Sequence, residues 1–148
     1  MKETDVFQLS DYAFIEAFDS RFARVYYLEE QKIAVSEMKA EYVPIEHFKE
    51  TFHHVGELVR GGYNSKFIFD KRALRAFHQP SMEWYYVEWK RDMLAHGLRV
   101  HRKILPDEPW FKKSVMIAKD QIHRQYPDNV IDQLDIQYCD TLEQAITT

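Results

Sequence analysis

The sequence predicts an α/β domain built on a mixed sheet, and three observations support this. Two β-rich runs, ARVYYLEE and KIAVSEMK, follow each other around a short polar turn and predict an antiparallel hairpin. Further strand-like runs then alternate with segments whose apolar residues recur every three or four positions. Strands separated by helices imply parallel crossovers, so we expect one domain over 1–148, an N-terminal hairpin followed by alternating helices and parallel strands.

The strands of the first half are short. Residues 12–19, YAFIEAFD, are expected to form an edge strand ahead of the hairpin, whose turn lies near Glu30 and Gln31. The run SKFIFDK is apolar and is bounded by turn residues, which predicts a buried strand that ends at Asp70.

A first helix is expected over residues 44–60. Its apolar residues recur at spacings of three and four and form one stripe: Ile45, Phe48, Phe52, Val55 and Val59. Pro44 is tolerated in the first turn of a helix, and Gly61 with Gly62 ends it.

A second helix is expected over residues 81–97, SMEWYYVEWKRDMLAHG, and it is unusually rich in aromatic residues. At 100° per residue one stripe faces the core, made of Met82, Tyr86, Trp89 and Met93, with Tyr85 at its flank. Trp84 does not join that stripe and lies near the opposite side, where Arg91 is two turns further along. A tryptophan there is either covered by another part of the fold or presented to a partner.

The remaining elements complete the alternation. LRVHRKIL predicts a strand, and the stretch PDEP breaks the chain after it. A third helix carries an apolar stripe from Phe111 to Tyr126. LDIQYCD predicts the last strand, and TLEQAI a terminal helix in which Thr141 and Gln144 have the spacing of a capping box.

Composition limits the function classes. The chain has 148 residues, of which 45% are hydrophobic, and only 4 Gly and 5 Pro, which suits a single core without long linkers. A net charge of −4 argues against a general nucleic-acid-binding surface. No stretch has the pattern of a signal peptide or the apolar length of a membrane span, so we expect a cytoplasmic protein.

Taken in order, the hairpin RVYYLEEQKIAVSEMK, the strand KFIFD, the helix and strand in PSMEWYYVEWKRDMLAHGLRVHRKILP and the final IQYCDTLEQAI resemble the SpoIIAA-like proteins. These are relatives of the STAS domain of anti-sigma factor antagonists and sulphate transporters. The resemblance covers roughly residues 24–146. It implies a small sheet flanked by helices and a regulatory role exerted through protein contacts rather than chemistry.

The resemblance does not extend to a phosphorylation switch. In the antagonists, serines follow the strand that ends in aspartate. Here Asp70 is followed by KRALRAF, and Ser81 is the next hydroxyl. We therefore expect no phosphorylation site, and expect Ser81 to cap or begin its helix.

No catalytic or metal-binding constellation is evident. Cys139 is the only cysteine and lies in an apolar strand, where burial raises the thiol pKa. His47, Glu50 and His54 share one helix face, but the two histidines are too far apart along the helix to bind one zinc ion together. No nucleophile elbow or phosphate-binding glycine loop is present. We expect a non-enzymatic protein without metal or cofactor.

A basic cluster is the stronger candidate for a binding site. Arg91, Arg99, His101 and Lys103 lie close together in the sequence, and the last three alternate along a strand, so they are expected to share one sheet face. This face is either simply solvated or a site for an anionic ligand or acidic partner.

Three functions therefore remain open. The first is a regulatory domain that binds a protein partner or itself, as a homodimer, with Trp84 on the contact surface. The second is a carrier of a small apolar or amphipathic ligand in a pocket lined by helix 81–97. The third is an enzyme that uses His101 and a nearby carboxylate as an acid–base pair.

Overall fold

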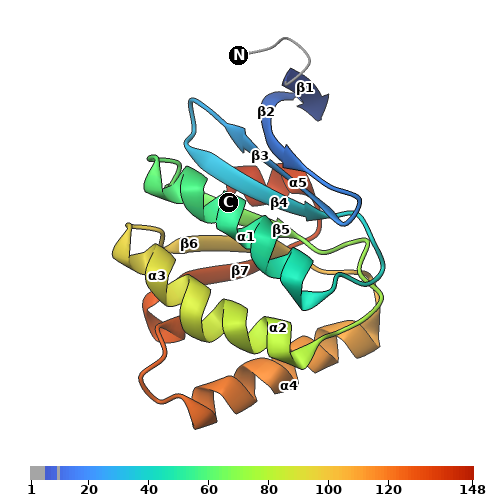
Figure 1. The fold of residues 1–148 in the computed structure, drawn as a ribbon, viewed down its shortest axis with the longest axis vertical. Helices are drawn as coiled ribbons and strands as arrows, with labels where there is room; N and C mark the ends of the chain where they lie inside the picture. The colour runs from blue at the N-terminus through green and yellow to red at the C-terminus, as the bar shows by residue number, and fades with distance from the viewer. Residues whose placement is uncertain (1–5, 10) are drawn as a thin grey trace.

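The structure, a computed structural model that describes residues 6–9 and 11–148, confirms the α/β class (Figure 1). One sheet contains seven strands in chain order: β1 (Val6–Leu9), β2 (Tyr12–Asp19), β3 (Ala23–Leu28), β4 (Ile33–Met38), β5 (Lys66–Asp70), β6 (Val100–Ile104) and β7 (Asp135–Cys139). The helices are α1 (Ile45–Arg60), α2 (Gln79–Trp84), α3 (Lys90–Ala95), α4 (Pro109–Gln125) and α5 (Leu142–Thr147). A π-helical turn (Tyr85–Trp89) joins α2 to α3, and a 3₁₀ turn (Ile131–Gln133) precedes β7.

The sheet is mixed, as the sequence predicts. Strands β1 to β4 pair antiparallel, and β4 to β7 pair parallel. Strand β1 is an addition that the sequence analysis did not predict; it pairs with the expected edge strand β2, which therefore lies inside the sheet. No described helix is both long and apolar enough to cross a membrane.

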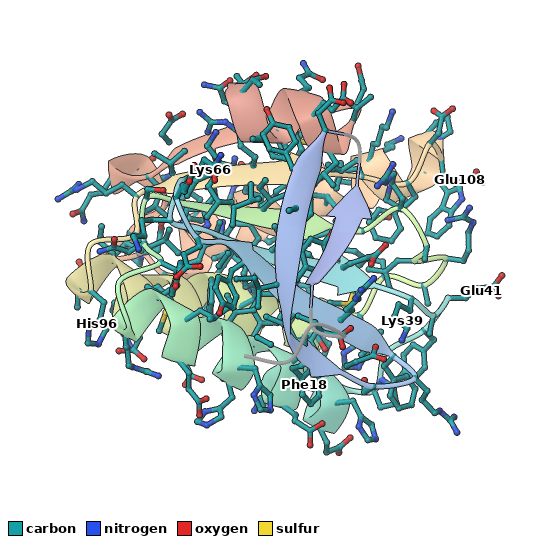
Figure 2. The ribbon with its side chains drawn as sticks, turned by 90° about the horizontal axis from the view of Figure 1, so that it is seen from above. Phe18, Lys39, Glu41, Lys66, His96 and Glu108 are labelled. Atoms are coloured by element: carbon teal, nitrogen blue, oxygen red, sulfur yellow. The ribbon has the colours of Figure 1, made fainter. Side chains whose placement is uncertain are left out.

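Helices cover both faces of the sheet and create two apolar clusters. Helices α1, α2, α3 and α4 pack on one face in the larger cluster, and α5 covers the other face (Figure 2). Lys66, labelled beside α5 in Figure 2, anchors that helix because its amine donates to the carbonyls of Ala145 and Ile146 at 2.9 and 2.7 Å.

Helix α1 follows its sequence pattern closely. Phe48, Phe52, Val55 and Val59 are buried, whereas Ile45 at the first position is only half-buried. Pro44 precedes the helix and its carbonyl accepts from Phe48 N at 2.9 Å, so proline stands just outside the first turn. The expected apolar face is confirmed.

The aromatic helix contains a local change of winding. The N–H of Lys90 donates to the carbonyl of Tyr85, five residues back, which is the hydrogen bond of a π turn. Both Tyr85 and Tyr86 are on the buried side of this segment. The predicted core stripe of Met82, Tyr86, Trp89 and Met93, with its flank Tyr85, is buried throughout.

Candidate functional site

A small cavity lies next to Lys71, the residue that follows β5. The N–H of Lys71 donates to the carbonyl of Ile104 at 2.8 Å, which fixes this segment against the end of β6. The carboxyl ends of parallel strands meet at one edge of a sheet, where open α/β folds place their ligands. The cavity therefore occupies a position typical of a binding site.

The lining of the cavity is largely apolar. Its residues come from the loop before α1, from α1, β5, the segment after β5, α2 with the π turn, and α4: Tyr42, Val43, Phe48, Phe69, Lys71, Leu74, Ala76, Phe77, His78, Ser81, Met82, Tyr85 and Phe111. Its volume is about 50 Å³, whereas a single water fills about 10–15 Å³ on the same measure. The cavity thus accommodates a few non-hydrogen atoms.

Lys71 is the one basic amine in this lining. The side chain is 5% exposed, and its amine makes no hydrogen bond or ion pair with any described residue. The amine lies over the ring of Phe69, whose centroid is 4.6 Å from Nζ. Burial lowers the pKa of Lys71 from 10.5 to about 7, because the charged form loses its hydration without gaining a counter-ion.

Two further lysines lie behind Lys71 in the core. Lys90 and Lys103 are both fully buried, and neither forms an ion pair within the described chain. The amine of Lys103 donates to the hydroxyl of Tyr86, whereas no oxygen acceptor contacts the amine of Lys90. We call Lys71, Lys90 and Lys103 the lysine cluster.

The electrostatics of the lysine cluster favour neutral amines. Burial is the main cause that lowers the pKa of Lys90 and of Lys103 well below the usual range, and the neighbouring lysines lower both further. Both amines lie near the rings of Tyr85 and Tyr86, with Nζ 4.1 Å from the Tyr86 centroid in each case. Among the described residues no carboxylate pairs with these three amines, so the amines are neutral unless an anion binds beside them.

Two polar residues at the start of α2 complete the cavity wall. His78 caps the helix, since its Nδ1 accepts from the backbone N–H of Ser81 at 3.3 Å, and Ser81 Oγ lies 2.8 Å from the same nitrogen. The helix therefore begins at Gln79 and is capped by His78, so the expectation that Ser81 caps or begins it is wrong; Ser81 lies in the first turn and is buried. The His78–Ser81 pair gives the otherwise apolar wall a source of exchangeable protons.

The predicted basic strand face is not a surface, which corrects one expectation. His101 and Lys103 do share a face of β6, but that face is covered by the aromatic helix and both residues are fully buried. Arg99 lies one residue before the strand and is exposed. The alternation correctly predicts that His101 and Lys103 share a face of the sheet, but it does not indicate which face a helix covers.

His101 also lacks the carboxylate that an acid–base pair needs. Neither ring nitrogen has a hydrogen-bond partner, and its ring packs near that of Phe67 with centroids 6.0 Å apart. Burial lowers the pKa of His101 well below the ordinary value, and the amines of Lys90 and Lys103 lower it further. The proposed role of His101 with a carboxylate is therefore wrong.

Trp84 and Arg91 are not brought together. Trp84 is half-buried between α1 and α2, with ring centroids 6.1 Å from Phe48 and 6.4 Å from Phe52, and the amine of Lys49 lies 5.5 Å from its ring. Arg91 is exposed in a separate groove beside the segment after α4. On a regular α-helix, two residues seven positions apart project from the same side. The π turn between Trp84 and Arg91 changes the angle between their side chains, so they project from different sides.

Sequence reasoning does not single out Lys71 or Lys90 as buried. A signal existed for each: Lys71 directly follows a strand predicted to be buried, and Lys90 adjoins Trp89 on the core stripe. Neither signal is enough to predict burial, because an unpaired lysine is rarely found in a core.

The histidines of α1 have structural partners. The ring of His54 stacks on Phe18, labelled in Figure 2, at 4.1 Å, and His47 packs on Phe22 at 4.3 Å. Across residues 6–9 and 11–148, no three His, Cys, Asp or Glu side chains are grouped as metal ligands. Cys139 is buried and its pKa is raised by burial, as its sequence context predicts.

Comparison with known proteins does not add to this description. No protein-family model matches the chain, and neither a curated protein nor a solved structure does. The resemblance to the SpoIIAA-like proteins therefore remains an expectation from the sequence, and the site is interpreted from its own geometry.

Proposed function

We propose that this protein binds a small amphipathic molecule with an anionic end, such as a short-chain carboxylate. The apolar part would occupy the cavity and the acidic group would meet the amine of Lys71. The proposal develops the ligand-carrier function that the aromatic helix suggests, since its residues Ser81, Met82 and Tyr85 line the cavity. It adds that the ligand carries a negative charge.

The observation that carries the proposal is an unpaired amine in an apolar cavity. Burying a cation without a partner costs several kcal/mol, and folded proteins normally avoid it. An anion bound at Lys71 would recover part of that cost by pairing with the ammonium group. The cavity lining contains no aspartate or glutamate, so a cationic ligand would find no carboxylate partner there.

The size of the cavity limits the ligand. About 50 Å³ holds a few water-sized groups, so a chain of about four carbon atoms is the longest that fits inside. A longer chain would have to leave through the mouth of the cavity, near the exposed Tyr42. We therefore expect short acids to bind better per atom than long ones.

The contact role that the SpoIIAA-like resemblance implies remains a prediction. Its main candidate, Trp84, packs on Phe48 and Phe52, so much of its apolar surface already has an intramolecular partner. The cavity offers a more specific arrangement of charge and shape than the Trp84 surface does.

Calorimetric titration with butanoate tests the proposal. Only protonated Lys71 attracts the carboxylate, so binding should be tightest at pH 6 and should weaken about tenfold for each pH unit above about 7. Butylamine, which has the same carbon chain and the opposite charge, should not bind.

Matched variants locate the effect. Lys71→Met should abolish butanoate binding, whereas Lys90→Met removes another buried amine that does not line the cavity and should leave most of the binding intact. Equal butanoate affinity in wild type and Lys71→Met, or an affinity that does not change between pH 6 and pH 9, would show that Lys71 is not the anion partner.

A further inference from the structure

We propose that Lys71 also reacts covalently, forming a reversible imine with small apolar aldehydes that enter the cavity. The inference rests on the same cavity as the proposed function, and it names a second ligand class and a reaction for it. It depends on geometry: a primary amine without a hydrogen-bond partner among the described residues forms part of the mostly apolar wall of a small cavity.

Amine nucleophiles need a neutral nitrogen with a free lone pair. Exposed lysines are protonated at neutral pH and therefore react slowly with carbonyl groups. An apolar pocket or a nearby cationic group activates a lysine by favouring its neutral form. Lys71 has the apolar pocket, and Lys90 and Lys103 lie close enough to be influenced by its charge.

No acidic partner holds the amine. A carboxylate beside Lys71 would stabilise the ammonium form and block the lone pair, but Asp70, the adjacent carboxylate, is bound to Arg72 at 2.7 and 3.0 Å. The amine of Lys71 instead lies against the ring of Phe69. Lys71 is therefore adjacent to Asp70 in the sequence but is not paired with its carboxylate.

The reaction balances without another reagent. The Nζ lone pair of Lys71 attacks the carbonyl carbon, and one proton passes from nitrogen to the carbonyl oxygen to give a neutral carbinolamine. A second proton then reaches that oxygen, the carbon–oxygen bond breaks and the oxygen leaves as water, and nitrogen gives up its second proton to leave the imine. His78 and Ser81, which line the same cavity, supply exchangeable protons for the loss of water.

Reductive trapping tests this inference. The full chain would be treated with butanal and sodium cyanoborohydride at pH 7, digested, and analysed by peptide mass mapping to compare Lys71 with exposed Lys112. We expect Lys71 to be alkylated at least about tenfold faster than Lys112, because burial lowers the pKa of Lys71 to about 7 and a large fraction of its amine is neutral at this pH.

The pH profile and ligand size provide independent readouts. Alkylation of Lys71 should rise up to about pH 7 and then level off. A bulky aldehyde such as naphthaldehyde should modify Lys112 but not Lys71, since the cavity holds about 50 Å³. Lys90→Met should still be alkylated at Lys71.

The outcomes separate this inference from the proposed function. Alkylation confined to exposed lysines and the terminal amine would overturn the imine, even if butanoate binds. Fast alkylation of Lys71 in a protein that does not bind butanoate would support the imine and refute the anion site. If both hold, butanoate should protect Lys71 from butanal.

Discussion

Replacement of Lys71 by methionine should stabilise the protein, and the gain should disappear at high pH. Each pKa unit is equivalent to about 1.36 kcal/mol, so lowering the pKa of Lys71 from 10.5 to about 7 disfavours folding with the charged amine by about 5 kcal/mol. This cost is fully present below about pH 7, where both the folded and the unfolded chain carry the proton. It is lost progressively between pH 7 and 10.5, because there only the unfolded chain binds the proton.

Methionine is a suitable replacement because it is flexible, similar in length and uncharged. Urea denaturation of both proteins at pH 6, 8 and 10 should give a difference in free energy of unfolding of several kcal/mol at pH 6. That difference should shrink steadily as the pH rises. Lys112→Met, which changes an exposed lysine, should show no comparable trend. A Lys71→Met protein that is less stable than wild type at pH 6, or a difference that is the same at all three pH values, would refute the reasoning.

Three other substitutions test the packing. Phe52→Ala should lower the free energy of unfolding by roughly 3–5 kcal/mol, since Phe52 is fully buried; a loss below about 1 kcal/mol in urea denaturation would mean that the face of α1 is misplaced. Trp84→Ser should cost about 2 kcal/mol, because the ring is half-buried, and should leave the sedimentation behaviour unchanged; a change in association with little loss of stability would restore the contact-surface hypothesis. Tyr86→Phe should cost roughly 1–3 kcal/mol, because it leaves the buried amine of Lys103 without its acceptor, and an unaltered thermal midpoint would contradict that hydrogen bond.

Periodicity predicted the elements whose stripes are strictly apolar. Helix α1 and strand β5 were identified because their buried residues belong to types that are almost always buried. Strand β1 was missed because VFQL is too short to show alternation, and it depends on pairing with β2. A local pattern indicates which residues share one face of a helix or strand. Which strands pair with each other depends on segments elsewhere in the chain.

The candidate site was harder to predict than the fold. The sequence indicated a pocket beside the aromatic helix, and that helix does line the cavity. It did not indicate Lys71, because nothing in KRALRAF shows that the first lysine is enclosed by Phe69, Leu74 and Phe111. Whether a charged residue is buried depends on contacts between distant segments, which one sequence does not display.

The π turn between α2 and α3 makes the aromatic helix tolerant of a change in length. A π turn holds one residue more than an α turn in about the same rotation, so removing one residue between Tyr85 and Trp89 would restore regular α-helical winding without rotating α2 against α3. Met82 and Ser81 would then keep their places in the cavity wall, and Met93 its place in the core. A one-residue gap at this point in an alignment would therefore be compatible with the same cavity.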